Sequence, residues 1–77
     1  MENEIKQRFA NVLVRLRKEK GISQQNLATL CDLERAYISR LERALVQPSL
    51  TTIVKIADAL KVNPSFIVSE FESENLT

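Results

Sequence analysis

The sequence predicts an all-α domain built from five helices. Apolar residues recur at three- and four-residue intervals, the spacing of one helix face, and no stretch alternates as a strand would. The chain holds one glycine and two prolines, so short turns are expected between its helices. A length of 77 residues suits one compact domain and not two. We therefore expect a single domain over residues 1–77.

The first helix is expected from about Glu4 to Lys20. Gly21 follows it and can take the left-handed backbone that ends a helix. Lys20 places a cation in the last turn, where the helix dipole favours positive charge. The apolar face of this helix is formed by Ile5, Phe9, Val12, Leu13 and Leu16.

The second helix is short, and Ser23 is its natural N-cap because a hydroxyl there can accept from a free backbone N–H. Asp32 breaks the helical pattern, and Leu33 then returns to the core. The residues expected to face inward are Leu27, Ala28 and Cys31.

The third helix begins near Glu34 and ends around Arg43 or Ala44. A connection containing one proline follows it, and the fourth helix starts around Ser49 or Leu50. The inner faces of these two helices are formed by Ile38 and Leu41, and by Ile53, Ile56, Ala57 and Leu60.

The fifth helix has a strong start signal, because Asn63 is a capping residue and Pro64 suits the first helical position. This helix is expected to fray into a polar tail over residues 72–77. Its apolar residues are Phe66, Ile67 and Phe71.

Residues 24–41 satisfy the steric rules for two helices that meet steeply through a tight turn. Ala28 is small enough to stand where the second helix of the pair crosses the first. Asp32, four residues on, stands where the turn needs a left-handed backbone, which Asp tolerates less easily than Gly. Neither helix is interrupted by proline, so a helix-turn-helix over about residues 24–43 is predicted. Its apolar wedge is formed by Leu27, Cys31, Leu33, Ile38 and Leu41.

Four segments match a known pattern: Ser23-Gln-Gln-Asn-Leu-Ala, Ala36-Tyr-Ile-Ser-Arg-Leu-Glu-Arg, Pro48-Ser-Leu and Ile56-Ala-Asp-Ala-Leu. With them the chain resembles the lambda-repressor-like, xenobiotic-response-element family of DNA-binding domains, from about Phe9 to Phe66. Within that family, residues 34–43 look closest to controller proteins of restriction-modification systems. Small phage-type repressors and antitoxins share much of the pattern.

The resemblance implies that the third helix reads bases in the major groove of operator DNA. Arg35 and Arg40 can each contact guanine O6 and N7, and Ala36 can meet a thymine methyl group. Glu34 has three possible roles, which are to accept from cytosine, to orient Arg35 or to cap the helix. The positions that correspond to base readers are Glu34, Arg35, Ala36 and Arg40.

Other positions correspond to DNA backbone contacts. Gln24 stands at the start of the second helix, where backbone N–H groups and the helix dipole favour a phosphate. Tyr37 either lies near a phosphate or packs across the second helix. Arg17 and Glu42 correspond to a partly buried ion pair that fixes the first helix against the third. The full set of backbone candidates is Gln24, Tyr37, Ser39, Arg43, Gln47 and Ser49.

Three positions depart from the family pattern. Asp32 replaces the usual glycine of the turn, and Ala44 replaces a frequent glycine after the third helix. Glu34 stands where a short capping Ser, Thr or Asp is common. At the first two positions a residue other than glycine adopts the required left-handed backbone less readily, but the fold stays intact. The third substitution affects the base-reading pattern.

Charge is distributed unevenly, although the net charge is only +1. The segment from Lys6 to Arg43 holds nine Lys or Arg and four Asp or Glu, a net of +5, and the rest of the chain carries −4. This asymmetry is typical of a basic face with an acidic remainder. Solvation of ordinary helix surfaces explains it equally well.

A two-fold dimer is expected, because DNA readers of this kind usually bind paired half-sites. The dimer surface needs apolar residues left over once the core is filled, although residues of the fifth helix can instead belong to the core. The candidates are Leu45, Val46, Phe66, Val68 and Phe71.

Several function classes are disfavoured. The chain has no histidine, no Gly-rich phosphate loop and no metal-ligating cluster, so we expect no enzyme, cofactor, metal or small-molecule ligand. A single cysteine and the lack of a targeting segment fit the cytoplasm. The longest uncharged runs have 11 residues, too short for the roughly 20 of a membrane span. The expected partners are double-stranded operator DNA and a second copy, with RNA polymerase as a further candidate. The alternative is an antitoxin-like module that binds a protein partner.

Overall fold

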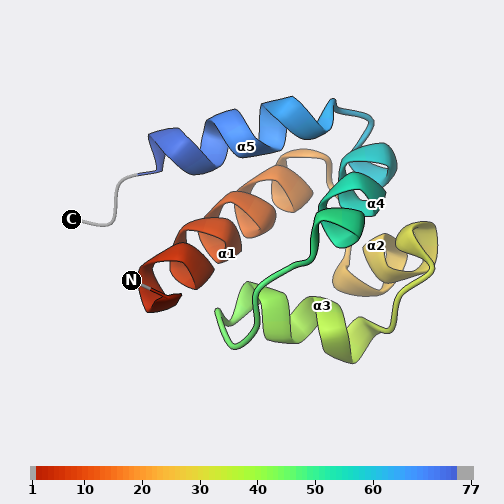
Figure 1. The fold of residues 1–77 in the computed structure, drawn as a ribbon. Helices are drawn as coiled ribbons and strands as arrows, with labels where there is room; N and C mark the ends of the chain where they lie inside the picture. Colours follow the sequence, from red (N-terminus) through yellow and green to blue (C-terminus); the bar gives the residue numbers. More distant parts are fainter. Residues whose placement is uncertain (1, 75–77) are drawn as a thin grey trace.

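Five helices form the molecule, as the computed structural model of the chain shows for residues 2–74 (Figure 1). No strand occurs in this part of the chain, so the predicted fold class is confirmed. The helices are α1 (Glu2–Glu19), α2 (Gln24–Cys31), α3 (Arg35–Glu42), α4 (Leu50–Leu60) and α5 (Pro64–Ser73).

Two expected boundaries were wrong by a few residues. Helix α1 begins at Glu2 rather than Glu4. Helix α5 continues to Ser73, so the first two residues of the expected polar tail are helical, and residues 75–77 lie outside the described part. Polar side chains do not end a helix whose inner face still packs, and Phe71 packs against the core near this end.

Helix α1 lies between α3 on one side and α5 on the other, while α2 and α4 close the remaining end (Figure 1). Polar contacts also join α1 to α5. Arg15 Nη1 donates to Glu70 Oε1 at 2.9 Å, and Asn11 Nδ2 donates to Glu74 Oε2 at 3.0 Å. None of the helices of residues 2–74 has the length and apolarity needed to cross a bilayer.

Serine side chains start two of the helices. Ser23 accepts from the backbone N–H of Asn26 at 3.0 Å, and Ser49 accepts from that of Thr52 at the same distance. Each bond satisfies one of the N–H groups that a helix start leaves free. The cap expected at Ser23 is therefore present, and it sets where α2 begins.

A left-handed residue ends or closely follows each of the helices α1 to α4, whereas α5 ends at Glu74 with φ −67°. Gly21 has φ 69°, and Asp32, at the turn position that the sequence marks, has φ 57°. Ala44 and Lys61 have φ 60°. Ala44 thus stands where the related pattern carries glycine, and a Cβ there is strained.

The core draws on every helix. Its buried apolar residues are Phe9, Ala10, Val12, Leu13, Leu16, Leu27, Ala28, Cys31, Ile38, Leu41, Ile56, Ala57, Leu60 and Ile67. Ile5, expected on an inner face, is 42% exposed, and Ile53 and Leu33 are only half-buried. Helical spacing defines a stripe of residues, whereas the neighbouring helices decide how much of that stripe is covered.

Candidate nucleic-acid interface

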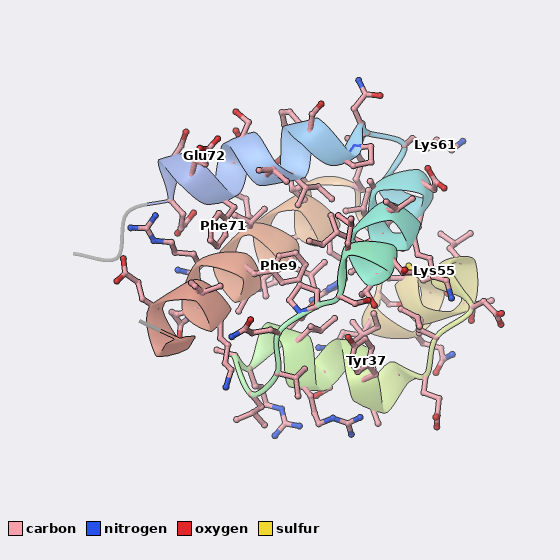
Figure 2. All side chains as sticks on the ribbon, in the orientation of Figure 1. Phe9, Tyr37, Lys55, Lys61, Phe71 and Glu72 are labelled. Atoms are coloured by element: carbon pink, nitrogen blue, oxygen red, sulfur yellow. The ribbon has the colours of Figure 1, made fainter. Side chains whose placement is uncertain are left out.

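Helix α3 carries the candidate base-reading residues on its outer face. Ile38 and Leu41 on its inner face are fully buried, and this burial fixes how the helix is rotated about its axis. Figure 2 shows nitrogen-tipped side chains projecting from α3 on the side away from α5. All four of the candidates are exposed: Glu34, Arg35, Ala36 and Arg40.

Three arginines of this surface have no ion-pair partner among the described residues: Arg35, Arg40 and Arg43. Elsewhere, Arg8 pairs with Glu4 at 2.7 Å, and Arg15 pairs with Glu70 at 2.9 Å. Because an unpaired guanidinium retains its full charge and its forked donors, this face can take carboxylates, phosphates or guanine edges.

Two of these arginines are held by neighbours on the same helix. The guanidinium carbon of Arg40 lies 5.9 Å from the centre of the Tyr37 ring. Arg43 Nε donates to the backbone oxygen and to Oγ of Ser39, at 3.3 and 3.2 Å. No such hydrogen bond or stacking contact restrains Arg35 within the described residues.

Glu34 precedes the first residue of α3, and its carboxylate makes no capping hydrogen bond. The helix therefore begins without a side-chain cap, in contrast to α2 and α4. Of the three roles that the sequence leaves open, capping has no support from this geometry.

The candidate residues for DNA backbone contacts differ in exposure and in the contacts that their side chains already make within the protein. Tyr37 is half-buried and packs against the core on the inner side of α3 (Figure 2). Ser49 Oγ caps α4 and also donates to Thr52 Oγ1 at 3.0 Å. Gln47 is exposed but lines an apolar groove described below. Arg43 is exposed, and Ser39 is half-buried beneath it.

A buried polar network joins α1, α2 and α3 behind this surface. Glu42 accepts from Nε of Arg17 through Oε2 and from Nη2 through Oε1, and Arg17 Nη1 donates to the backbone oxygen of Ile22 at 2.7 Å. The two charged side chains are 12% and 6% exposed. The hydrogen bonds to Glu42 raise the pKa of Arg17 above its ordinary value, against the opposing effect of burial.

Gln24 joins this network, which the sequence did not indicate. Its Nε2 donates to Glu42 Oε1 at 2.9 Å. Eighteen residues separate the two positions along the chain, so only the crossing of α2 and α3 brings them together. The family pattern assigns each residue a separate role and carries no signal of the contact.

An apolar groove lies between α1, α5 and the connection before α4. Its volume is about 210 Å³. Val68, which lines the groove, is 45% exposed. Phe66 is 42% exposed, but it stands two residues earlier in α5 and so on nearly the opposite side of that helix. Two further dimer candidates, Phe71 and Val46, instead pack against the core, and Leu45 is 53% exposed. The groove is lined by Ile5, Phe9, Gln47, Pro48, Ile53, Ile67, Val68 and Phe71.

The sequence is similar to those of known helix-turn-helix proteins. Residues 13–67 match a family model described as helix-turn-helix. The control protein C.MunI of a Mycoplasma species is 41% identical over 73 residues, covering 94% of this chain and 99% of C.MunI. The control protein C.BamHI of Bacillus amyloliquefaciens is 43% identical over 65 residues, covering 83% of this chain and 80% of C.BamHI.

A solved structure of a controller protein has a similar fold. The crystal structure of the restriction-modification controller protein C.AhdI from Aeromonas hydrophila superposes with a TM-score of 0.78 at 39% sequence identity. The match covers 80% of this chain and 94% of C.AhdI. Sequence and fold therefore point to the same group of proteins.

Proposed function

This chain belongs to the helix-turn-helix family, and from that premise we propose that it is the controller protein of a restriction-modification system. It acts as a sequence-specific DNA-binding transcriptional regulator and not as an enzyme. The observation that carries the proposal is the outer face of α3, whose inner face is anchored in the core. There Arg35 and Arg40 of the helix, and Arg43 directly after it, have no ion-pair partner among residues 2–74. The described residues 2–74 fold as one domain, and its proposed place of action is the cytoplasm, without a cofactor.

Base reading is assigned to the exposed side chains of α3 and of Glu34, which precedes it. Arg35 and Arg40 donate to guanine O6 and N7, and each such pair discriminates by about 1–3 kcal/mol per base pair. Ala36 meets a thymine methyl group. Glu34, which does not cap its helix, either accepts from cytosine N4 or orients Arg35.

Backbone contacts position the protein and carry no sequence information directly. We assign them to α2 and to the far end of α3, with the amide of Gln24 and the guanidinium of Arg43 as the principal donors. Hydroxyl and amide groups nearby supply the remainder, from Tyr37, Ser39, Gln47 and Ser49.

The dimer is assigned to the apolar groove and to the exposed residues beside it. Val68 leaves apolar surface on α5 that the monomer does not cover, and Ile5 adds to it across the groove. Phe66 is exposed on another side of α5 and is not part of this face. An isologous contact through this face relates two α3 helices by a two-fold axis. Half-sites one helical turn apart, about 34 Å, are then expected. RNA polymerase is a further proposed partner of the bound dimer.

Salt dependence tests this proposal against a role in holding a protein partner. Each phosphate contact releases counterions, so affinity for DNA should fall steeply as salt rises. Arg43→Ala should weaken binding to every sequence and lower the salt slope by about 1, whereas Arg35→Ala should also relax the preference at one base pair. Lys61→Gln is the matched loss of one charge, at the end of α4 remote from α3 (Figure 2). Equal effects of all three substitutions would contradict the assignment of α3.

A further inference from the structure

We propose that Glu42 is a positioning residue for DNA binding, which fixes the amide of Gln24 so that an N–H group faces a phosphate. The inference rests on the proposed function and deepens it. It gives the buried ion pair a role in affinity in addition to its role in holding α1 against α3.

The geometry of the network carries the proposal. Gln24 is the first residue of α2 and is half-buried, so its side chain reaches both the interior and the surface. One hydrogen of its Nε2 is donated to Glu42 Oε1, at 2.9 Å between the heavy atoms. An amide nitrogen carries two donors. Within residues 2–74 the other hydrogen of Gln24 Nε2 makes no hydrogen bond, so it can bind an acceptor outside the protein.

The carboxylate decides which way the amide faces. A flipped amide would turn its carbonyl oxygen toward Glu42 Oε1. Both oxygens are acceptors and no hydrogen would lie between them, so they would repel each other. The flip would also carry the NH₂ group away from its present place. With Glu42 ionised, only the orientation that offers N–H is stable, and a phosphate needs that orientation.

Arg17 makes this arrangement compatible with DNA. A lone carboxylate near the phosphate backbone would repel it, but Glu42 is neutralised by two hydrogen bonds from Arg17. Its side chain is only 6% exposed, so phosphate meets the Gln24 amide rather than the charge behind it. The N-terminal end of α2 adds free backbone N–H groups to the same region.

Scanning the operator with single neutral methylphosphonates tests the proposal. In the wild-type chain, neutralising the phosphate that Gln24 contacts should weaken binding by roughly three- to tenfold per half-site. Gln24→Met removes the amide and Glu42→Gln removes the ionised acceptor, and both should reduce this loss by the same amount at the same phosphate, to the part that backbone N–H groups of α2 supply. Losses at the phosphate bound by Arg43 should persist. Gln25→Met is the matched control, because Gln25 bonds only within α2, to Thr29 Oγ1.

Combining the substitutions separates positioning from a general structural role. Once Glu42→Gln is present, Gln24→Met should change affinity no further, since the first substitution has already removed the oriented donor. Arg17→Met with Glu42→Leu provides an apolar background without a buried lone charge, and it should show the same missing phosphate contact while remaining folded.

The outcomes are distinct. A folded Glu42→Gln variant with the wild-type phosphate profile, or additive effects of the two substitutions, would overturn the positioning role alone. A wild-type chain that binds no DNA would overturn the proposed function together with it.

Discussion

Removing the guanidinium of Arg17 should destabilise the domain strongly. In Arg17→Met the aliphatic stem remains, but Glu42 keeps its charge with only the Gln24 amide as a partner, and Ile22 loses a donor to its backbone oxygen. Breaking a buried pair on one side costs about 3–5 kcal/mol. Because Arg17 is still 12% exposed, so that water can reach the site, we expect the lower end, about 3 kcal/mol.

That loss is large for a chain of this size. Domains of this length unfold with roughly 4–12 kcal/mol, so a loss of about 3 kcal/mol removes a sizeable share of the stability. The melting temperature should fall by roughly 12–24 °C. Urea unfolding of Arg17→Met, followed by circular dichroism, measures the change as a shift of the midpoint at constant slope.

The double variant Arg17→Met/Glu42→Leu is the comparison that decides the cause. It removes the uncompensated carboxylate, so it should recover much of the lost stability. If Arg17→Met lowers the free energy of unfolding by less than about 1 kcal/mol, the Arg17–Glu42 pair contributes no more than an exposed salt bridge does, and the reasoning is refuted.

Three further predictions concern the backbone, the proposed dimer face and the buried thiol. Ala44→Gly should stabilise the fold by about 0.5 kcal/mol, because relief of the left-handed strain exceeds the added entropy of the unfolded chain. Ala59→Gly within α4 should instead destabilise it by about 1 kcal/mol in the same urea assay. Val68→Asp should convert the dimer to a monomer in sedimentation analysis, and an unchanged dimer would contradict the assigned face; Ser69→Asp, a neighbouring exposed position, should not. Burial raises the pKa of the Cys31 thiol, against a smaller opposing effect of Lys55. The folded state thus favours the neutral thiol. The stability that this preference adds is fully present below the unfolded pKa of about 8.5 and is lost as pH rises through the pKa of the folded state. Unfolding free energy should therefore fall less steeply above about pH 8.5 in Cys31→Ala than in the wild type.

Local rules predict most of the fold. The cap at Ser23 and the left-handed turn at Asp32 are present, because a hydroxyl acceptor and a short polar side chain act within a few residues. Lys61 is also left-handed, yet lysine has no preference for that conformation and the sequence does not mark it. It follows the last turn of α4, where the N–H groups of Lys61 and Val62 bond back to carbonyls of the helix.

The site is less fully predicted than the fold. Helical spacing marks Ile38 and Leu41 as the inner residues of α3, and the charges of Arg35 and Arg40 predict that both side chains are exposed, which is a property of one helix. The bond from Gln24 to Glu42 depends instead on the angle between two helices, which no local pattern determines. The groove beside Val68 likewise depends on how α1, α5 and the connection before α4 meet.

Selection of bound duplexes from a random DNA pool, with the purified chain at about physiological salt, tests the central claim most directly. A dimeric major-groove reader should recover a two-fold-symmetric site whose half-sites lie about 34 Å apart. Recovery of no preferred sequence would contradict the assignment of α3 as a recognition helix and favour a role in binding a protein partner.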